Sequence, residues 1–158
     1  MSRDWPQDPT MVLKRYGNFK PDRFAESAGR QPWANRREKR EGNSNRHLFL
    51  VKSLPCLICG VVGPSDPHHL RHDLAAKERG VGQKATDRWT LPLCRNCHGD
   101  VHALGSRRER EWFEDHGYQA LALADALWVN SGDLSRLHRV LLAHKLAASR
   151  ELLMRRKP

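Results

Sequence analysis

Apolar residues are sparse at the start of the chain and become regularly spaced only in its second half. Residues 1–46 contain four prolines, and the run from Asn35 to Arg46 is charged and polar with no apolar period. A segment of this kind buries too little apolar surface to fold by itself, and the prolines interrupt any helix. Residues 1–46 are therefore predicted to form a basic, largely irregular arm.

The central part of the chain has short apolar segments separated by glycine and proline. The run 47–54 is either a helical turn or a strand, because so short a run does not distinguish the two by its period. Val61–Val62 and the segment around His68–Leu70 are predicted to pair as a short hairpin. Residues 74–86 are polar and contain glycine, which predicts a loop, and residues 89–93 form a second short apolar strand or turn.

Helical spacing dominates after the last cysteine. A first helix is predicted from about residue 96 to Leu104, with Gly105 at its C-terminus. Ser106 and Glu109 have the spacing of a capping box, which predicts a second helix that ends near Gly117.

Two further helices are predicted at the C-terminal end. Residues 118–129 are rich in alanine and leucine, and residues 134–152 carry apolar side chains at helical intervals. The last helix either covers the small core or pairs with another protomer as a homodimer. Covering the core is the preferred interpretation.

Composition and charge narrow the class of protein. The chain has 158 residues and a formal net charge of +10, which suits a polyanionic partner such as DNA, or simply keeps a basic chain soluble. No apolar run is long enough for a transmembrane helix, so no membrane association is predicted. The first residues lack the apolar segment of a secretory signal, and a cytoplasmic location is expected.

All four cysteines lie in two C-x2-C pairs, Cys56 with Cys59 and Cys94 with Cys97. In a chain without an export signal, such pairs are typical of metal ligands rather than disulfides. Four thiolates complete the tetrahedral shell of a structural Zn²⁺ ion, which stabilises a segment with few core residues. A structural zinc site is therefore predicted here.

Five of the nine histidines lie close to the second cysteine pair or between the two pairs. His98 and His102 are four residues apart on a predicted helix, so they share one face and can bind one ion. His68 and His69 are adjacent on a predicted strand and point to opposite sides, so one can complete a three-histidine metal site while the other faces the substrate. The alternative is that His98 only supports the cysteine site and the others are surface residues.

These motifs resemble the HNH (ββα-metal) nucleases, in particular the branch with a four-cysteine zinc site that includes phage and prophage enzymes. The resemblance covers about residues 47–116. Its K-x2-D…P-L-C-x2-C-H…H signature is matched by Lys84, Asp87, Pro92, Leu93, Cys94, Cys97, His98 and His102, and it is preceded by Cys56, Cys59, Asp66, His68 and His69.

The resemblance implies a DNA endonuclease in which His69 is the general base that activates water. His68, His98 and His102 would hold one catalytic metal ion, and the products would carry a 5′-phosphate and a 3′-hydroxyl. Mg²⁺ or Mn²⁺ is the expected catalytic ion, although imidazole ligands also suit Zn²⁺ and Ni²⁺. The family's middle asparagine has no clear match, and Asp87 is the best candidate to orient His69.

The resemblance also suggests how DNA would be bound. Double-stranded DNA is the favoured substrate, and the candidate phosphate contacts are Arg71, Lys84, Arg88, Arg95, Arg107 and Arg108. A zinc-stabilised DNA-binding module without catalysis is the main alternative. A non-enzymatic partner protein that works through its C-terminal helices is a third hypothesis.

The predicted architecture is α+β. It comprises the arm 1–46, a small zinc-stabilised ββα-metal (HNH) core at 47–116 and a C-terminal helical extension at 117–158.

Overall fold

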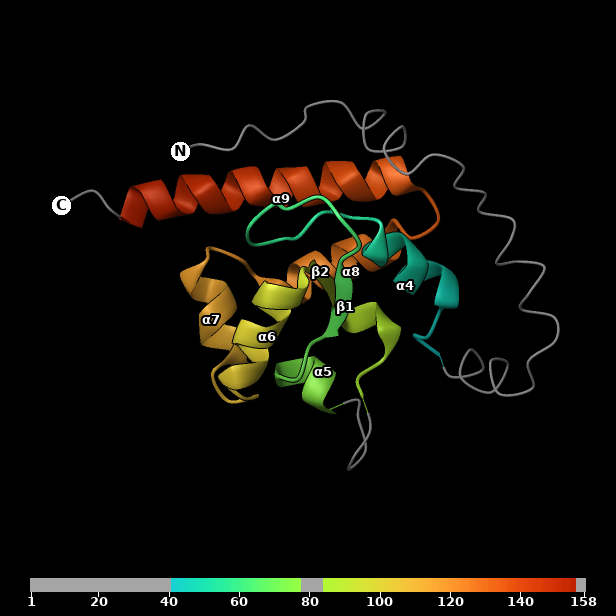
Figure 1. Cartoon of the computed structure of the whole chain (residues 1–158), viewed down its shortest axis with the longest axis horizontal. Coiled ribbons are helices and arrows are strands. Elements are labelled where there is room, and N and C mark those ends of the chain that lie inside the picture. The colour runs from blue at the N-terminus through green and yellow to red at the C-terminus, as the bar shows by residue number, and fades with distance from the viewer. Residues whose placement is uncertain (1–40, 78–83, 156–158) are drawn as a thin grey trace, which may run out of the picture. The chain divides into compact units, whose positions relative to one another are not determined.

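The computed structural model describes residues 41–77 and 84–155, so most of the predicted arm and part of the predicted loop 74–86 lie outside it. Residues 44–158 form one compact unit. Within the described residues the chain is α+β, with a two-stranded sheet and several helices (Figure 1). No helix among these residues has both the length and the apolar character needed to cross a membrane.

The sheet joins two strands that are distant in the sequence. Strand β1 (Asp66–His69) pairs antiparallel with β2 (Thr90–Leu93), and His69 lies opposite Thr90. The predicted hairpin between Val61–Val62 and the segment around His68 is therefore wrong. The Val61 carbonyl instead accepts the Cys56 amide at 3.0 Å and closes the turn that carries the first cysteine pair.

Helix α4 (Asn45–Lys52) resolves the ambiguity of the run 47–54. The side chain of Ser44 accepts the His47 amide and caps the helix, which favours a helix over a strand. Leu50 and Val51 are buried on its inner face.

The predicted loop 74–86 is only partly irregular. A short helix, α5 (Asp73–Lys77), occupies its start, and a 3-10 turn, η2 (Asp87–Trp89), follows its end. The loop prediction failed at α5 because five residues are too short to show a helical period.

The helices predicted after the cysteines are present. They are α6 (Arg95–Ala103), α7 (Glu109–Asp115), α8 (Ala120–Val129) and α9 (Leu134–Arg155). Gly105 and Gly117 have φ of +74° and +80° and follow α6 and α7, as their sequence positions predict. A Cβ at Gly117 would lie 2.9 Å from the Ala148 carbonyl, so glycine also permits α9 to pass close to this turn.

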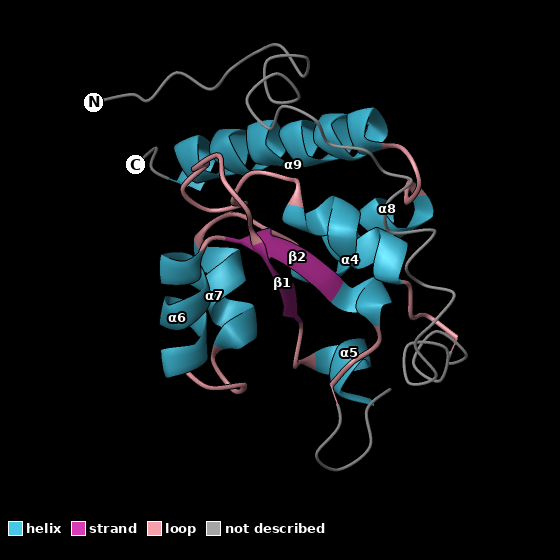
Figure 2. Cartoon of the chain, turned by 45° about the vertical axis from the view of Figure 1, so that its right-hand side comes forward, coloured by secondary structure: helices cyan, strands magenta, loops and turns pink. Residues whose placement is uncertain are grey.

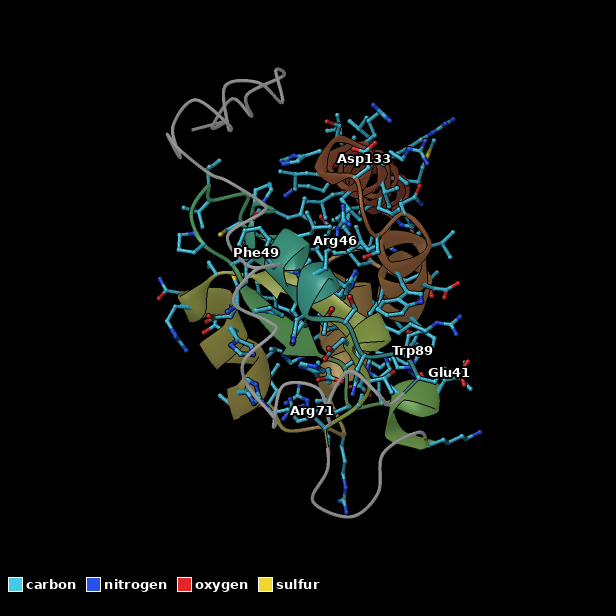
Figure 3. The ribbon with its side chains drawn as sticks, turned by 90° about the vertical axis from the view of Figure 1, so that its right-hand side faces the viewer. Glu41, Arg46, Phe49, Arg71, Trp89 and Asp133 are labelled. Carbon is cyan, nitrogen blue, oxygen red and sulfur yellow. The ribbon has the colours of Figure 1, made fainter. Side chains whose placement is uncertain are left out.

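Figure 2 shows the sheet between α6 and α7 on one side and α4 on the other, with α9 across one end. Helices α8 and α9 contribute to the same core as the strands. In Figure 3, Arg46 lies on the side of Asp133, whereas Arg71 lies toward the opposite end. The Arg46 guanidinium donates to the Gly132 carbonyl at 3.0 Å. The largest buried side chains of this core include Leu54, Leu57, Leu70, Leu91, Leu93, Phe113, Leu123, Leu127, Leu137 and Leu141.

Candidate functional site

The two cysteine pairs converge on one point. The four sulfur atoms lie within 4.8 Å of one another, and Cys59 Sγ is 3.6 Å from Cys94 Sγ. None of the four forms a disulfide. The first pair sits on a turn closed by Gly60, and the second lies at the start of α6, where Cys94 is the N-cap residue. This arrangement is compatible with a zinc site.

The thiols are not independent of one another. Burial, together with the neighbouring Cys56 and Cys94, raises the pKa of Cys97 well above its usual range. Thiolates at this distance repel one another, so a cation is needed to keep all four deprotonated. The chemistry of the four sulfurs therefore fits a soft divalent metal ion.

Three histidines form a second cluster, the three-histidine site (His68, His98 and His102). One ring nitrogen from each lies within 4.8 Å of the others, and the Nε2 atoms of His98 and His102 are 3.1 Å apart. The His68 ring is almost perpendicular to both of the other rings, with centroid distances of 5.0 and 5.3 Å. The Nδ1 atom of His68 is buried and has no hydrogen-bond partner among the described residues.

These three imidazoles are biased toward the neutral form that binds metals. Burial, then the neighbouring His68 and His102, lower the pKa of His98 to about 4. Burial is also the main reason why the pKa of His68 and the pKa of His102 are lowered. Neutral imidazole has a lone pair to donate, so the site suits a cation at neutral pH.

Glu109, the first residue of α7, lies fully buried behind this site. Its Oε1 atom is 2.9 Å from His68 Nε2 and accepts from Arg71 Nε at 2.9 Å. Its Oε2 atom accepts from the Arg71 amide at 2.6 Å and lies 2.7 Å from His72 Nδ1. Burial raises the pKa of Glu109, but the hydrogen bonds from His68, His72 and Arg71 outweigh it and hold that pKa well below its usual range.

His69 points away from His68, as alternation along a strand predicts. Its Nε2 atom is 3.0 Å from Asp87 Oδ1, and the other oxygen of Asp87 accepts the Ser44 amide at 3.0 Å. Asp87 is buried, whereas the His69 side chain keeps 13% of its surface exposed. A buried carboxylate therefore holds one nitrogen of a histidine that solvent can still reach.

Comparison with known protein families places these clusters in a wider context. The model of the family described as a protein of unknown function, DUF968, matches residues 28–130. The chain belongs to the DUF968 family. The matched range contains all four cysteines of the first cluster, the three-histidine site, His69, Asp87 and Glu109.

One curated relative of this DUF968 chain is the uncharacterized protein YdfU of Escherichia coli K12. The two are 33% identical over 97 residues, which is 61% of this chain and 24% of YdfU. The chain thus spans about a quarter of the length of that relative. No solved structure matches the chain significantly.

The predicted phosphate contacts of the DUF968 chain fall into two groups. Arg71, Arg88 and Arg95 have acidic partners, which are Glu109, Asp125 and Asp66. Lys84, Arg107 and Arg108 are exposed, and Arg108 has only a long contact of 3.9 Å to Glu111. Arg71 also contacts the three-histidine site, with Nη1 3.3 Å from His102 Nδ1. A DNA-binding role for these six side chains stays a prediction.

The sequence did not point to Glu109 as part of the site. Its spacing from Ser106 predicted a capping box, but Arg108 is the N-cap residue of α7 and no side chain caps the helix. Glu109 instead contacts His68, 41 positions earlier in the chain. Its only indication in the sequence is that a group of buried histidines needs an acidic partner somewhere.

Proposed function

We propose that this protein is a metal-dependent endonuclease of the HNH type that hydrolyses DNA phosphodiester bonds. The observation that carries the proposal is the three-histidine site, in which one ring nitrogen each of His68, His98 and His102 lies within 4.8 Å of the others. The Nδ1 atom of His68 is buried there without a hydrogen-bond partner among the described residues. Strands β1 and β2 and helix α6 are the elements expected of a ββα-metal core, and β1 and α6 supply all three histidines.

The residues fit a transition-metal ion. A buried lone pair that nothing satisfies costs free energy, and a cation shared by three imidazoles removes that cost. Mn²⁺, Ni²⁺ or Zn²⁺ suits three nitrogen ligands better than Mg²⁺, which prefers oxygen. When bound, such an ion would stabilise negative charge on the scissile phosphate and on the departing 3′-oxygen.

His69 is the proposed general base. Because an ionised carboxylate only accepts hydrogen bonds, Asp87 holds His69 with its proton on Nε2 and its lone pair on Nδ1. A neutral imidazole held in this way takes a proton from water at neutral pH. Arg71 adds positive charge beside His102, where a phosphate would approach. The resemblance to HNH enzymes gives the expected products, a 5′-phosphate and a 3′-hydroxyl.

The four-cysteine cluster is the proposed structural zinc site. It joins the turn before β1 to the start of α6. The +10 net charge of the chain supports a polyanionic substrate.

Plasmid cleavage tests the proposal. Wild-type protein with its zinc site filled should nick or linearise plasmid DNA with Mn²⁺ or Ni²⁺, and EDTA should abolish the reaction. His69→Ala should lower the cleavage rate by at least about 100-fold because general-base catalysis contributes that much. His144→Ala, which changes a histidine on α9 outside both clusters, should cut at the wild-type rate.

The zinc content and the melting temperature of each variant separate catalysis from folding. Cleavage that is lost only in a folded, zinc-loaded His69→Ala protein supports both the nuclease and its base. If the wild-type protein shifts DNA in a gel but does not cut it with any of the metals, the protein is instead a DNA-binding module.

A further inference from the structure

The hydrogen-bonding contacts of the Glu109 carboxylate fill its acceptor capacity, which is about four lone-pair sites. Each of its two oxygens has two contacts. One of them comes from His68, and the others come from the consecutive residues Arg71 (two contacts) and His72 (one contact). An ionised carboxylate is an acceptor only, so each histidine nitrogen that faces it must carry a proton. The contacts therefore determine the tautomer of His68 as well as its position.

The tautomer decides whether His68 can bind a cation. With the proton on Nε2, which faces Glu109, neutral His68 has its lone pair on Nδ1. Nδ1 is the buried atom without a hydrogen-bond partner among the described residues. Because Nε2 faces Glu109, Nδ1 is the nitrogen of His68 that is left for a cation shared with His98 and His102. With the proton on Nδ1 instead, His68 would have no lone pair to offer there.

We propose that Glu109 is a positioning residue that holds His68 in the tautomer whose Nδ1 can bind a cation. The inference rests on the proposed function only for the identity of the three cation-binding histidines. Glu109 does not touch the ion or the substrate and acts through His68.

The backbone around Glu109 supports this role. Asp73 has a φ of +48°, and no other non-glycine residue in the described ranges has a positive φ. Strained backbone of this kind persists where the surroundings enforce it. The strained residue directly follows Arg71 and His72, the two residues that wrap around the Glu109 carboxylate. The same turn brings the Arg71 guanidinium to His102.

Glu109→Gln is the informative substitution because it keeps the size of the side chain. The Arg71 amide is fixed by the backbone, so the Gln carbonyl oxygen takes the place of Oε2 and its NH₂ group takes the place of Oε1. That NH₂ group then faces His68 Nε2 as a donor, and it no longer accepts the hydrogen bond from Arg71 Nε. His68 must move its proton to Nδ1 to accept it, which removes the lone pair from the three-histidine site.

The matched control is His72→Gln. His72 contacts the same carboxylate, but through Oε2 and on the side away from His68. A role limited to stabilising the fold predicts that both substitutions lower the melting temperature and that neither changes the affinity for a cation selectively.

The first experiment is calorimetric titration of Ni²⁺ into full-length protein whose cysteine site is filled with zinc, with no DNA present. Glu109→Gln is expected to weaken Ni²⁺ binding by about 10–100-fold, as loss of a carboxylate that orients a histidine ligand does in other metal sites. His72→Gln is expected to keep the wild-type affinity. Equal Ni²⁺ affinity in wild type and Glu109→Gln would overturn the inference.

The second experiment needs no substitution and so does not depend on a variant that folds. Long-range ¹H–¹⁵N spectra of the zinc-loaded wild type without Ni²⁺ should show His68 protonated on Nε2 alone. Protonation on Nδ1, or on both nitrogens, at neutral pH would overturn the inference. Neither experiment measures cleavage, so the role of Glu109 can hold even if the plasmid assay rejects the nuclease, and the reverse is also true.

Discussion

His47 is a buried histidine that the proposed mechanism does not use. Its Nδ1 atom is 2.9 Å from Ser131 Oγ, and its ring forms a T-shaped contact with Trp128 at a centroid distance of 4.9 Å. Burial lowers its pKa to about 4, although the charge of Asp87 raises it. Its Nε2 atom has no hydrogen-bond partner among the described residues, so a proton there would be poorly solvated.

This pKa predicts a loss of stability in acid. The unfolded chain binds a proton at its usual pKa of 6.5, and the folded chain binds it only near 4. Between these values the unfolded state holds more protons, so the free energy of unfolding falls as the pH falls through this range. The loss from His47 reaches at most about 3 kcal/mol once the pH is below both values.

Urea denaturation of wild type and His47→Phe between neutral pH and pH 4 measures this effect. The variant should be less stable at neutral pH because it loses the Ser131 contact, but its stability should fall less steeply in acid. The other histidines with lowered pKa values and the cysteine site titrate in both proteins, so they cancel in the difference. Parallel curves would show that His47 is not the group responsible.

Residue roles were predictable where they follow from local spacing. The C-x2-C pairs and the i, i+4 histidines give both clusters directly, and the opposite directions of His68 and His69 follow from strand alternation. Glu109 and His47 were not predictable in the same way. Their partners lie 41 and 84 positions away in the sequence, and no local pattern encodes such a contact.

At the scale of elements, α9 is attached to the turn that carries Cys56 and Cys59. The Nζ atom of Lys145 donates to the Leu57 carbonyl at 2.8 Å and to the Cys56 carbonyl at 3.4 Å. Tyr118 Oη donates to the same Leu57 carbonyl at 3.0 Å. Burial lowers the pKa of Lys145, and the cysteines oppose this effect because a thiolate cluster attracts the ammonium group.

Lys145→Met should therefore weaken two properties together. The free energy of unfolding should fall by about 1–2 kcal/mol because a charged hydrogen bond to the carbonyl of the buried residue Leu57 is lost. Zinc should leave the protein at a lower chelator concentration because the cation beside the thiolates is gone. Urea denaturation and a competitive zinc chelator measure the two effects.

Arg139→Met is the control, since Arg139 is an exposed basic residue of the same helix. It should change stability by less than about 0.5 kcal/mol. If Lys145→Met lowers stability but leaves the zinc affinity unchanged, then Lys145 stabilises the packing of α9 on the turn of Cys56 and Cys59 and has no electrostatic effect on the cysteines.

The elements themselves were predicted unevenly, for a physical reason. Helices α6 to α9 were predictable because each has its own apolar period or a glycine at its end. The pairing of β1 with β2 was not, because each strand has four residues and the partners are separated by α5 and η2. Strands this short are specified by the surrounding core rather than by their own sequence.

At the scale of the whole molecule, the cysteine cluster joins the two ends of the segment that carries both strands. Residues 60–93 lie between the two cysteine pairs, and they include β1, α5, η2 and β2. Structural zinc binds small domains with an apparent free energy of about 10–16 kcal/mol, which is comparable to the entire stability of a typical domain, about 5–15 kcal/mol. The fold is therefore expected to depend on the ion.

Two substitutions distinguish the role of this cluster from that of the three-histidine site. Cys97→Ser removes one buried thiol, so the protein should bind no zinc tightly and should lose its cooperative thermal transition. His102→Ala removes an exposed histidine that is a proposed ligand of the other cluster. This variant should keep the transition within about 5 °C of wild type while losing the proposed Ni²⁺ site. Melting followed by far-UV circular dichroism, with zinc and Ni²⁺ content measured on the same samples, checks both expectations.

If Cys97→Ser melts like the wild type, the cysteines do not stabilise the fold and are free for another task. If His102→Ala unfolds instead, the histidines are part of the structure, and the separation between a structural and a reactive metal site fails.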